Sequence, residues 1–265
     1  MRNKLLALAL AVTLALAASL PALAIVYGEE DTANVYDYVG AMIVFVPDLG
    51  FRQVCSGTLI SRTVFLTAAH CTAFAEEQGW SAYVTFEPVF DADNVDPGKL
   101  IAGTMHTHPQ FGSGGNDDPH DIAVIVLSKA VKKIEPASLP IEDLLGALNV
   151  KNGLDGQKFL AVGYGVVEPE IGPGGLTFFG NGTRRFALSE FNALNAHWLR
   201  LSQNQATDDG GTCYGDSGGP NFLGTSKTIA AITVTGDVPC LATNDTYRVD
   251  TPSARAFLGQ FVTLP

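Results

Sequence analysis

Strand-length runs of β-branched and aromatic residues recur along this chain and limit the folds open to it. Beyond residue 24, such runs cover Val39–Val46, Val64–Ala69, Ala82–Phe86, Ile122–Leu127, Phe159–Val162 and Ile229–Val234. Turn-forming residues separate them, as at Asp96-Pro97-Gly98 and Gly112–Asn116. Many short strands with turns between them are typical of a β-barrel or a β-sandwich. The sequence therefore predicts an all-β fold.

Helical periodicity is weak until the end of the chain. There Ser253, just after Pro252, can cap a short helix that runs through Phe257 and Phe261. Lys129–Ala147 is rich in lysine and proline and divides the chain beyond residue 24 into nearly equal halves. We expect this segment to connect two strand-rich units.

The first 24 residues have the pattern of a secretory signal peptide. Arg2 and Lys4 give a positively charged start, Leu5–Leu20 is almost wholly apolar, and Ala22-Leu23-Ala24 matches a signal peptidase site. A membrane-spanning helix needs about 20 apolar residues, which is more than this run offers. We expect residues 1–24 to be removed and the remainder to be secreted, either to the cell exterior or to a periplasm.

The charge balance argues against two classes of partner. The chain has 16 Lys and Arg against 27 Asp and Glu, a net charge of −11 at pH 7. Removal of residues 1–24 takes away two basic residues and no acidic one, so the net charge of the remainder is −13. Nucleic acid phosphates and anionic lipids repel such a protein. We therefore expect neither nucleic acid nor a membrane as a partner once the signal is removed.

Four cysteines in an exported protein favour two disulfides. Cys55 and Cys71 lie 16 residues apart, and Cys213 and Cys240 lie 27 residues apart. Three pairings can be drawn, and the local one is the default because the other two would join the halves of the chain. A metal site is the alternative, but no Cys-x-x-Cys spacing occurs.

Three segments carry residues suited to acyl transfer by a serine. Gly215–Pro220 places Ser217 among glycines, which lets a substrate carbonyl come close to backbone N–H groups. His70 ends an apolar run, and Asp121 opens another. A serine hydroxyl becomes a good nucleophile when a base takes its proton and a third group orients that base. The three residues together therefore indicate nucleophilic catalysis.

These segments resemble motifs of the chymotrypsin/trypsin family of secreted serine proteases. The matching segments, in the order of the family, are Ile25–Gly28, Thr67–Cys71, His108–Phe111, Asp121–Ala123, Ala161–Gly165 and Gly215–Pro220. The resemblance implies two six-stranded antiparallel β-barrels with a short C-terminal helix and the active site between them. The N-terminal barrel would cover residues 25–135 and the C-terminal barrel residues 136–265, together one peptidase unit. We expect no cofactor and no metal.

The resemblance also implies a role for each site residue. Ser217 would be the nucleophile, His70 the general base and then acid, and Asp121 the group that orients the imidazole. The N–H groups of Gly215 and Ser217 would form the oxyanion hole.

Two of the family's disulfides match this chain. They are Cys55–Cys71, beside His70, and Cys213–Cys240, beside the substrate pocket, which agrees with the local pairing. A third disulfide, common in animal members, has no counterpart here.

The expected substrate pocket departs from the trypsin pattern. The residue six before the serine is Gly211 instead of aspartate, and the pocket residues are completed by Thr212, Tyr214, Val234, Thr235 and Gly236. Val234-Thr235-Gly236 replaces the usual Ser-Trp-Gly. Counting back from Tyr247 gives Asp245 as the pocket-wall residue, which predicts an acidic pocket that accepts Lys or Arg. The alternative is that Asp245 faces solvent and takes no part in the pocket.

An activation ion pair is the last site prediction. In the family a new N-terminal Ile pairs with the aspartate before the nucleophile. Here Ile25 directly follows the signal peptidase site, so that cleavage would release its amine to pair with Asp216. The competing prediction is earlier cleavage, for example after Ala18, with a short propeptide.

Two other functions remain open from the sequence. A catalytically silent homologue could keep the barrels for binding or regulation, although all three catalytic residues are present. His106 and His108, with Asp117, Asp118 and His120 nearby, suggest a zinc site that lacks a placed third ligand. We expect a monomer that binds no metal, acts on protein or peptide substrates and is open to protein protease inhibitors. The sequence does not predict the natural substrate or calcium binding.

Overall fold

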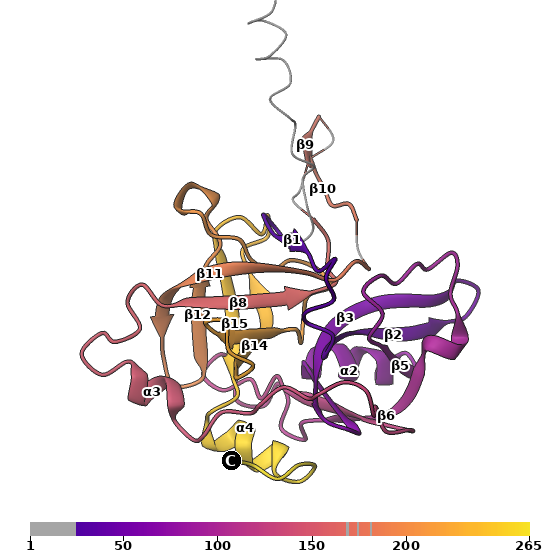
Figure 1. Cartoon of the computed structure of the whole chain (residues 1–265), viewed down its shortest axis with the longest axis horizontal. Helices are drawn as coiled ribbons and strands as arrows, with labels where there is room; N and C mark the ends of the chain where they lie inside the picture. The colour runs from indigo at the N-terminus through magenta and orange to yellow at the C-terminus, as the bar shows by residue number, and fades with distance from the viewer. Residues whose placement is uncertain (1–24, 168–169, 174, 181) are drawn as a thin grey trace, which may run out of the picture.

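Two antiparallel β-barrels form the body of the molecule and lie side by side (Figure 1). The computed structural model describes residues 25–265 apart from 168–169, 174 and 181. The predicted signal peptide, residues 1–24, lies outside the described residues. The fold class predicted from the sequence, two six-stranded antiparallel barrels with a short C-terminal helix, is confirmed.

The first barrel closes in the order β2-β3-β4-β7-β6-β5. Its strands are β2 (Val39–Val46), β3 (Gly50–Ser61), β4 (Val64–Thr67), β5 (Ala82–Thr85), β6 (Ile101–Thr107) and β7 (Ala123–Leu127). Helix α2 (Ala69–Glu77) follows β4, and the 3-10 turn η1 (Pro97–Lys99) precedes β6.

The second barrel is a sheet in the order β11-β12-β15-β14-β13-β8, closed by pairing of β8 with β11. Its strands are β8 (Lys158–Gly163), β11 (Arg185–Leu194), β12 (Trp198–Ser202), β13 (Pro220–Leu223), β14 (Ile229–Gly236) and β15 (Thr243–Arg248). The short strand β1 (Glu29–Glu30) adds to β11, η2 (Gln205–Thr207) follows β12, and α4 (Pro252–Leu258) ends the fold.

Burial explains which strands the sequence predicts well. Val39–Val46 is strand β2 to the residue, and six of its eight residues are buried between β3 and β5. By contrast, the twelve-residue strand β3 carries Arg52, Gln53 and Ser56, which interrupt its apolar pattern. Two of these polar side chains bond to the second barrel: Gln53 Nε2 donates to the Gly215 carbonyl at 3.0 Å, and Ser56 Oγ donates to the same carbonyl at 2.9 Å.

The helices differ from the prediction in two places. The predicted strand Val64–Ala69 ends at Thr67, and residues 69–77 form helix α2, with His70 in its first turn. The C-terminal helix is capped by Thr251, whose Oγ1 accepts from Ala254 N at 3.2 Å, and not by Ser253. Pro252 then occupies the first helical position, where its missing N–H has no cost.

The segment between β7 and β8 connects the barrels and touches both. Ala137 N donates to Leu59 O at 2.9 Å, and Ser138 N donates to Lys227 O at 2.9 Å. Helix α3 (Leu144–Leu148) lies near its end. The predicted boundary after residue 135 falls inside this segment and stays a prediction.

Both predicted disulfides are present. Cys55–Cys71 joins β3 to α2 and Cys213–Cys240 joins the segment before Ser217 to the turn between β14 and β15. With loops of 16 and 27 residues, each stabilises the fold by about 3 to 4 kcal/mol in the chain-entropy model.

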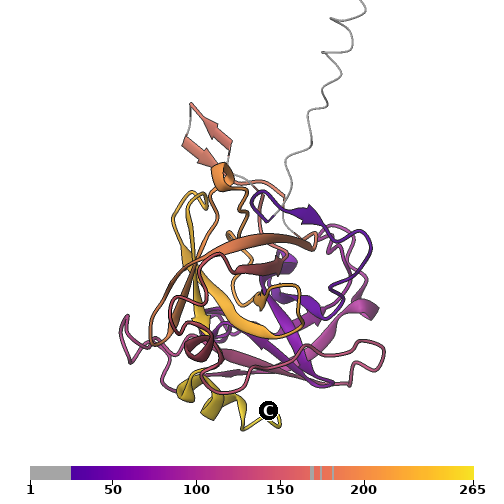
Figure 2. The same ribbon diagram turned by 60° about the vertical axis from the view of Figure 1, so that its left-hand side comes forward.

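The hairpin of β9 (Glu170–Gly172) and β10 (Gly175–Thr177) stands clear of both barrels in the two views (Figures 1 and 2). Among the described residues, no helix has the length and apolar character needed to cross a bilayer.

Candidate active site

His70 and Asp121 meet because their strands are neighbours. β4 leads into His70, Asp121 lies just before β7, and these strands pair at Thr67 and Ala123. Asp121 Oδ2 lies 2.8 Å from His70 Nδ1, and Asp121 Oδ1 accepts from the backbone N of His70 at 2.9 Å. The carboxylate is buried, whereas the imidazole is about one-third exposed. A proton held on Nδ1 leaves the lone pair of the neutral ring on Nε2.

Ser217 lies against β3 and against Cys71, the residue that follows His70. Ser56 N donates to the Ser217 carbonyl at 2.8 Å, and Cys71 Sγ lies 3.9 Å from the same oxygen. The next residue, Gly218, has φ +78°, and a Cβ on it would lie 2.1 Å from Thr67 Oγ1. Only glycine allows so close an approach. Ser217 and His70 are thus brought to the same junction of the two barrels.

Two backbone N–H groups beside Ser217 are free to receive an oxyanion. Among the described residues, neither Gly215 N nor Ser217 N donates to another protein group. The Gly215 carbonyl accepts from Gln53 Nε2 at 3.0 Å and from Ser56 Oγ at 2.9 Å, which fixes this turn. A fixed turn with unused donors fits the requirement for an oxyanion hole.

Asp216 is a fully buried carboxylate. Its Oδ2 accepts from Cys213 N at 2.9 Å and its Oδ1 from Gly165 N at 2.7 Å. Burial raises the pKa of Asp216 to about 7, and the two N–H groups offset only part of that rise. No cation contacts it in the part of the chain that the structure describes.

Ile25 is buried near the same region. Its side chain packs with Ala161 and Ala187, and the following residue, Val26, forms a bridge with Gly211. In the full-length chain Ile25 is bonded to Ala24 and carries no ammonium group. No hydrogen bond joins Ile25 to Asp216 within the described residues.

A cavity of about 200 Å³ opens beside Ser217. Five of the predicted pocket residues line it with Ser217 and the Cys213–Cys240 disulfide: Thr212, Tyr214, Val234, Thr235 and Gly236. Thr233, Asp237 and Val238 complete the lining. We call this space the Ser217 cavity.

Gly211 does not line the Ser217 cavity. It is buried, and its N donates to Val26 O at 2.9 Å. The predicted floor residue is thus displaced from the surface of the cavity.

Asp245 is also outside the Ser217 cavity, which corrects the predicted acidic pocket wall. On β15 the residue opposite Gly236 is Asn244, one place before the residue obtained by counting back from Tyr247. Because side chains alternate along a strand, a one-residue difference moves a side chain to the other face. Asp245 instead pairs with Arg200, directly opposite it on β12. This pair lines a second cavity of about 440 Å³ together with Trp198.

Two buried amide side chains behind the Ser217 cavity were not predicted from the sequence. Asn244 and Gln203 are both fully buried although they are polar. The available signal was the alternation of β15: Asn244 and Thr246 share one face, and Asp245 shares the other with Tyr247. Asn244 and Thr246, which with Asp245 form a glycosylation sequon in the sequence, therefore have buried side chains in the folded chain, whereas Asp245 faces outward.

The histidines considered for zinc have other partners. Asp118 accepts from Tyr247 Oη at 2.7 Å, and its oxygens lie 3.3 Å from His120 Nδ1 and 3.2 Å from His197 Nε2. Burial raises the pKa of Asp118, but the Tyr247 hydrogen bond and the two imidazoles outweigh it and hold this pKa below its usual value. His108 stacks on His120 with ring centres 4.7 Å apart, and burial lowers the pKa of His108.

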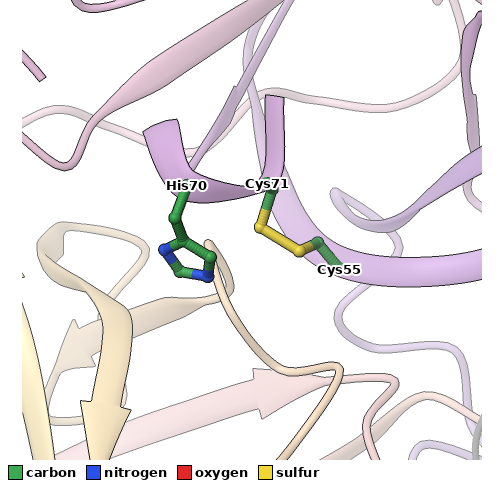
Figure 3. A group of neighbouring side chains, drawn as sticks. All are labelled: Cys55, His70 and Cys71. Carbon is green, nitrogen blue, oxygen red and sulfur yellow. A yellow bond between two sulfur atoms is a disulfide. The ribbon is translucent and has the colours of Figure 1, made fainter. Parts of the chain in front are cut away.

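A different cluster has the spacing of metal ligands. Among the described residues, this spacing occurs only at Cys55, His70 and Cys71. The two sulfurs there form a disulfide beside the imidazole (Figure 3), so they cannot act as thiolate ligands.

Curated relatives are serine proteases. Serine protease 7 of Drosophila melanogaster is 29% identical over 140 residues, 47% of this chain and 36% of that protein. Venom serine protease Bi-VSP of Bombus ignitus is 28% identical over 183 residues, 64% of this chain and 48% of that protein. Kallikrein-8 of Rattus norvegicus is 29% identical over 198 residues, 72% of this chain and 70% of that protein. The chain thus spans between about a third and a half of the first two relatives.

A solved structure shares the fold. HL collagenase superposes with a TM-score of 0.64 over 89% of this chain and 97% of that one, at 18% sequence identity. At this identity the match supports the two-barrel fold alone.

A family model gives the assignment. The model described as trypsin matches residues 25–170, the part of the chain that holds His70 and Asp121. Since this match covers more than half of the residues, the chain belongs to the trypsin family.

Proposed function

We propose that this chain is a secreted serine endopeptidase that cleaves peptide bonds through an acyl-enzyme on Ser217. The observation that carries the proposal is the His70–Asp121 pair, with its 2.8 Å Nδ1–Oδ2 contact, beside a cavity lined by Ser217. The relatives named as serine proteases support the same reaction class.

In the first half of the proposed reaction, Ser217 Oγ attacks the carbonyl carbon of the substrate and passes its proton to His70 Nε2. The negative charge on the carbonyl oxygen is met by the N–H groups of Gly215 and Ser217, each worth roughly 3 to 4 kcal/mol in comparable sites. The C–N bond then breaks, and His70 gives the proton to the leaving amine. Asp121 stays ionised and stabilises the imidazolium.

In the second half, water attacks the ester carbon and gives a proton to His70 Nε2. The C–O bond to Ser217 breaks, and the proton returns from His70 to Ser217 Oγ. The net change is hydrolysis of one peptide bond, with no cofactor required.

We also infer that activation pairs the new amine of Ile25 with Asp216. A buried carboxylate with a raised pKa and a buried Ile25 near the signal peptidase site support this pairing. N-terminal sequencing of active secreted protein tests it, because the pairing requires a start at Ile25. A start after Ala18 on active protein contradicts it and favours a short propeptide.

Labelling with diisopropyl fluorophosphate tests the reaction itself. We expect one phosphoryl group per chain on Ser217, located by mass spectrometry of the digested protein, and loss of hydrolysis in step with labelling. If the folded parent protein takes no label, the proposed reaction is contradicted. The alternative is then a catalytically silent homologue that acts in binding or regulation.

A further inference from the structure

Gln203 occupies the space that a side chain at residue 211 would need. A Cβ built on Gly211 would lie 2.1 Å from Gln203 Oε1 and 2.5 Å from Gln203 Cβ. Gln203 is itself fully buried. Its carboxamide therefore lies against the backbone of Gly211 and Thr212, and Thr212 lines the Ser217 cavity.

The orientation of this carboxamide leaves a donor unused. Thr212 N lies 3.0 Å from Gln203 Oε1 and can only donate, so the oxygen must face Thr212. Gln203 Nε2 then has no hydrogen-bond partner among the described residues. A buried N–H without a partner is costly, so this group calls for an acceptor from a ligand or a water molecule.

Asn244 supplies the matching unused acceptor. Its Nδ2 donates to Asn221 Oδ1 at 3.1 Å, and Asn221 Nδ2 donates to Thr233 Oγ1 at 3.0 Å. Asn244 Oδ1 has no partner among the described residues. Gln203 N bonds to Ala242 O, so Gln203 and Asn244 are diagonal neighbours on the inner face of β12 and β15. The layer behind the Ser217 cavity thus consists of uncharged amides and hydroxyls.

The acidic side chain that lines the cavity is already engaged. Asp237 accepts from the backbone N of Leu241, Ala242 and Thr243 at 2.9, 2.9 and 2.7 Å. Burial raises the pKa of Asp237, but these hydrogen bonds outweigh it and hold this pKa below the usual value. Asp237 stays ionised, but three backbone N–H groups already hold its oxygens, so it compensates a cationic side chain for leaving water less well than an unengaged carboxylate would.

We propose that Gln203 sets the selectivity of the Ser217 cavity, and that this cavity receives an uncharged side chain of the residue whose carbonyl is attacked. The inference rests on the proposed endopeptidase function, because the cavity adjoins the nucleophile. Neither Gln203 nor Asn244 lines the cavity, so the free Gln203 Nε2 and Asn244 Oδ1 would act on that side chain from the layer behind Thr212, through bridging water. Replacing Gln203 by an acidic residue would then shift the preference of the enzyme from neutral toward basic substrate residues.

Peptide substrates that differ only in this residue test the proposal. With Phe, Tyr, Leu, Gln, Arg, Lys and Glu at the position, we expect the parent kcat/KM for the best neutral residue to exceed that for Arg and Lys by at least about tenfold. Gln203→Glu keeps the oxygen that accepts from Thr212 N and replaces Nε2 by an anionic oxygen. It should raise the ratio of Arg to Phe hydrolysis by at least about tenfold. Gln205→Glu, an exposed site two residues on, is the matched control and should leave the ratio unchanged.

A parent enzyme that prefers Arg or Lys overturns the proposal, as does a folded Gln203→Glu variant with the ratio of the parent. If Gln203→Glu does not fold, Asn244→Asp places the charge in the same layer and is judged by the same ratio. If neither variant folds, the parent enzyme alone tests the proposal: a higher kcat/KM for neutral residues than for Arg and Lys supports it, and the reverse overturns it.

A binding measurement separates this proposal from the proposed reaction. Benzamidine is a cationic aromatic amidine, and benzamide is its neutral counterpart. On Ser217→Ala protein, calorimetry should give benzamidine no advantage over benzamide, and the added Gln203→Glu change should create one. Tighter benzamidine binding without that change overturns the assignment of Gln203 even if the chain hydrolyses nothing. Failure of all hydrolysis, with the expected binding pattern, counts against the reaction alone.

Discussion

Asp121 holds His70 at two points, through the imidazole Nδ1 at 2.8 Å and through the backbone N at 2.9 Å. Each carboxylate oxygen has one partner, so the ring and the first turn of α2 are fixed by the same group. The proposed base is therefore oriented by the junction of β4 and β7 in the first barrel.

Asp121→Asn should remove activity with little change in fold. An amide can accept from only one of the two His70 groups, and an NH₂ facing Nδ1 forces the ring proton onto Nε2, where the base function is lost. We expect kcat to fall by about 10⁴-fold. Steady-state kinetics on titrated enzyme measures the change, and circular dichroism melting checks the fold. A folded variant that keeps a tenth of the parent kcat contradicts the assigned role.

Ser217→Ala should abolish the acyl-enzyme. The loss in kcat is expected to be on the order of 10⁶-fold, because the remaining groups of a catalytic triad do little alone. Stability should barely change, since Ser217 contacts its neighbours Ser56 and Cys71 through its backbone carbonyl. Hydrolysis of a short ester and of casein at the parent rate would exclude Ser217 as the nucleophile.

The sequence predicts the site better than it predicts the edges of the cavity. Ser217, His70 and Asp121 stand in short local motifs, and the disulfides beside them follow from spacing. Asp245 was misplaced because the residue opposite Gly236 depends on the register between β14 and β15, and a bulge between Thr233 and Thr235 shifts that register. No local pattern reveals such a bulge.

Other features need the tertiary structure to appear. Helix α2 begins directly after a buried strand and has no side-chain cap, so the usual sequence signal for a helix start is missing. Gln203 reads as part of a polar turn, because its neighbours in the sequence are Ser202 and Asn204. The side chain of Gln203 is buried because Gly211 has no side chain to fill that space. The positions of the two residues in the sequence do not reveal this packing.

Loss of the Cys55–Cys71 disulfide should destabilise the fold by about 3 kcal/mol. The bond closes a 16-residue loop between β3 and α2, and its removal frees that loop mainly in the unfolded chain. Urea unfolding of the Cys55→Ser/Cys71→Ser double variant in the Ser217→Ala background, which prevents self-cleavage, measures the difference. An unchanged midpoint with an unchanged slope would show that the loop entropy does not contribute.

Asp245→Asn should leave the choice of substrate residue unchanged. Asp245 pairs with Arg200 on the outer face of β15, away from the Ser217 cavity. We expect kcat/KM for Arg, Lys, Phe and Leu substrates to change by the same factor, within about twofold, because an exposed pair contributes little. A selective loss for Arg and Lys would return Asp245 to the wall of the cavity and contradict the register of β15.

The stability of the uncleaved chain should fall as pH rises toward neutrality because of Asp216. Burial raises the folded-state pKa of Asp216 from 3.8 to about 7. The folded chain therefore holds this proton where the unfolded chain has lost it. Its stabilising effect is complete below the unfolded pKa and is lost as pH rises through the folded value. The loss amounts to roughly 4 kcal/mol at most, at 1.36 kcal/mol per pKa unit.

Asp216→Asn is the matched control for this titration, because it cannot ionise and offers a carboxamide of the same size. The free energy of unfolding, measured by urea between pH 4 and pH 8 in the Ser217→Ala background, should drop more steeply for the uncleaved parent than for the variant. Chain that starts at Ile25 should lose much of the slope, since an ammonium group beside Asp216 favours the carboxylate and lowers its pKa. Equal slopes for uncleaved and cleaved chains would mean that the new amine does not reach Asp216, and the inferred ion pair would fail.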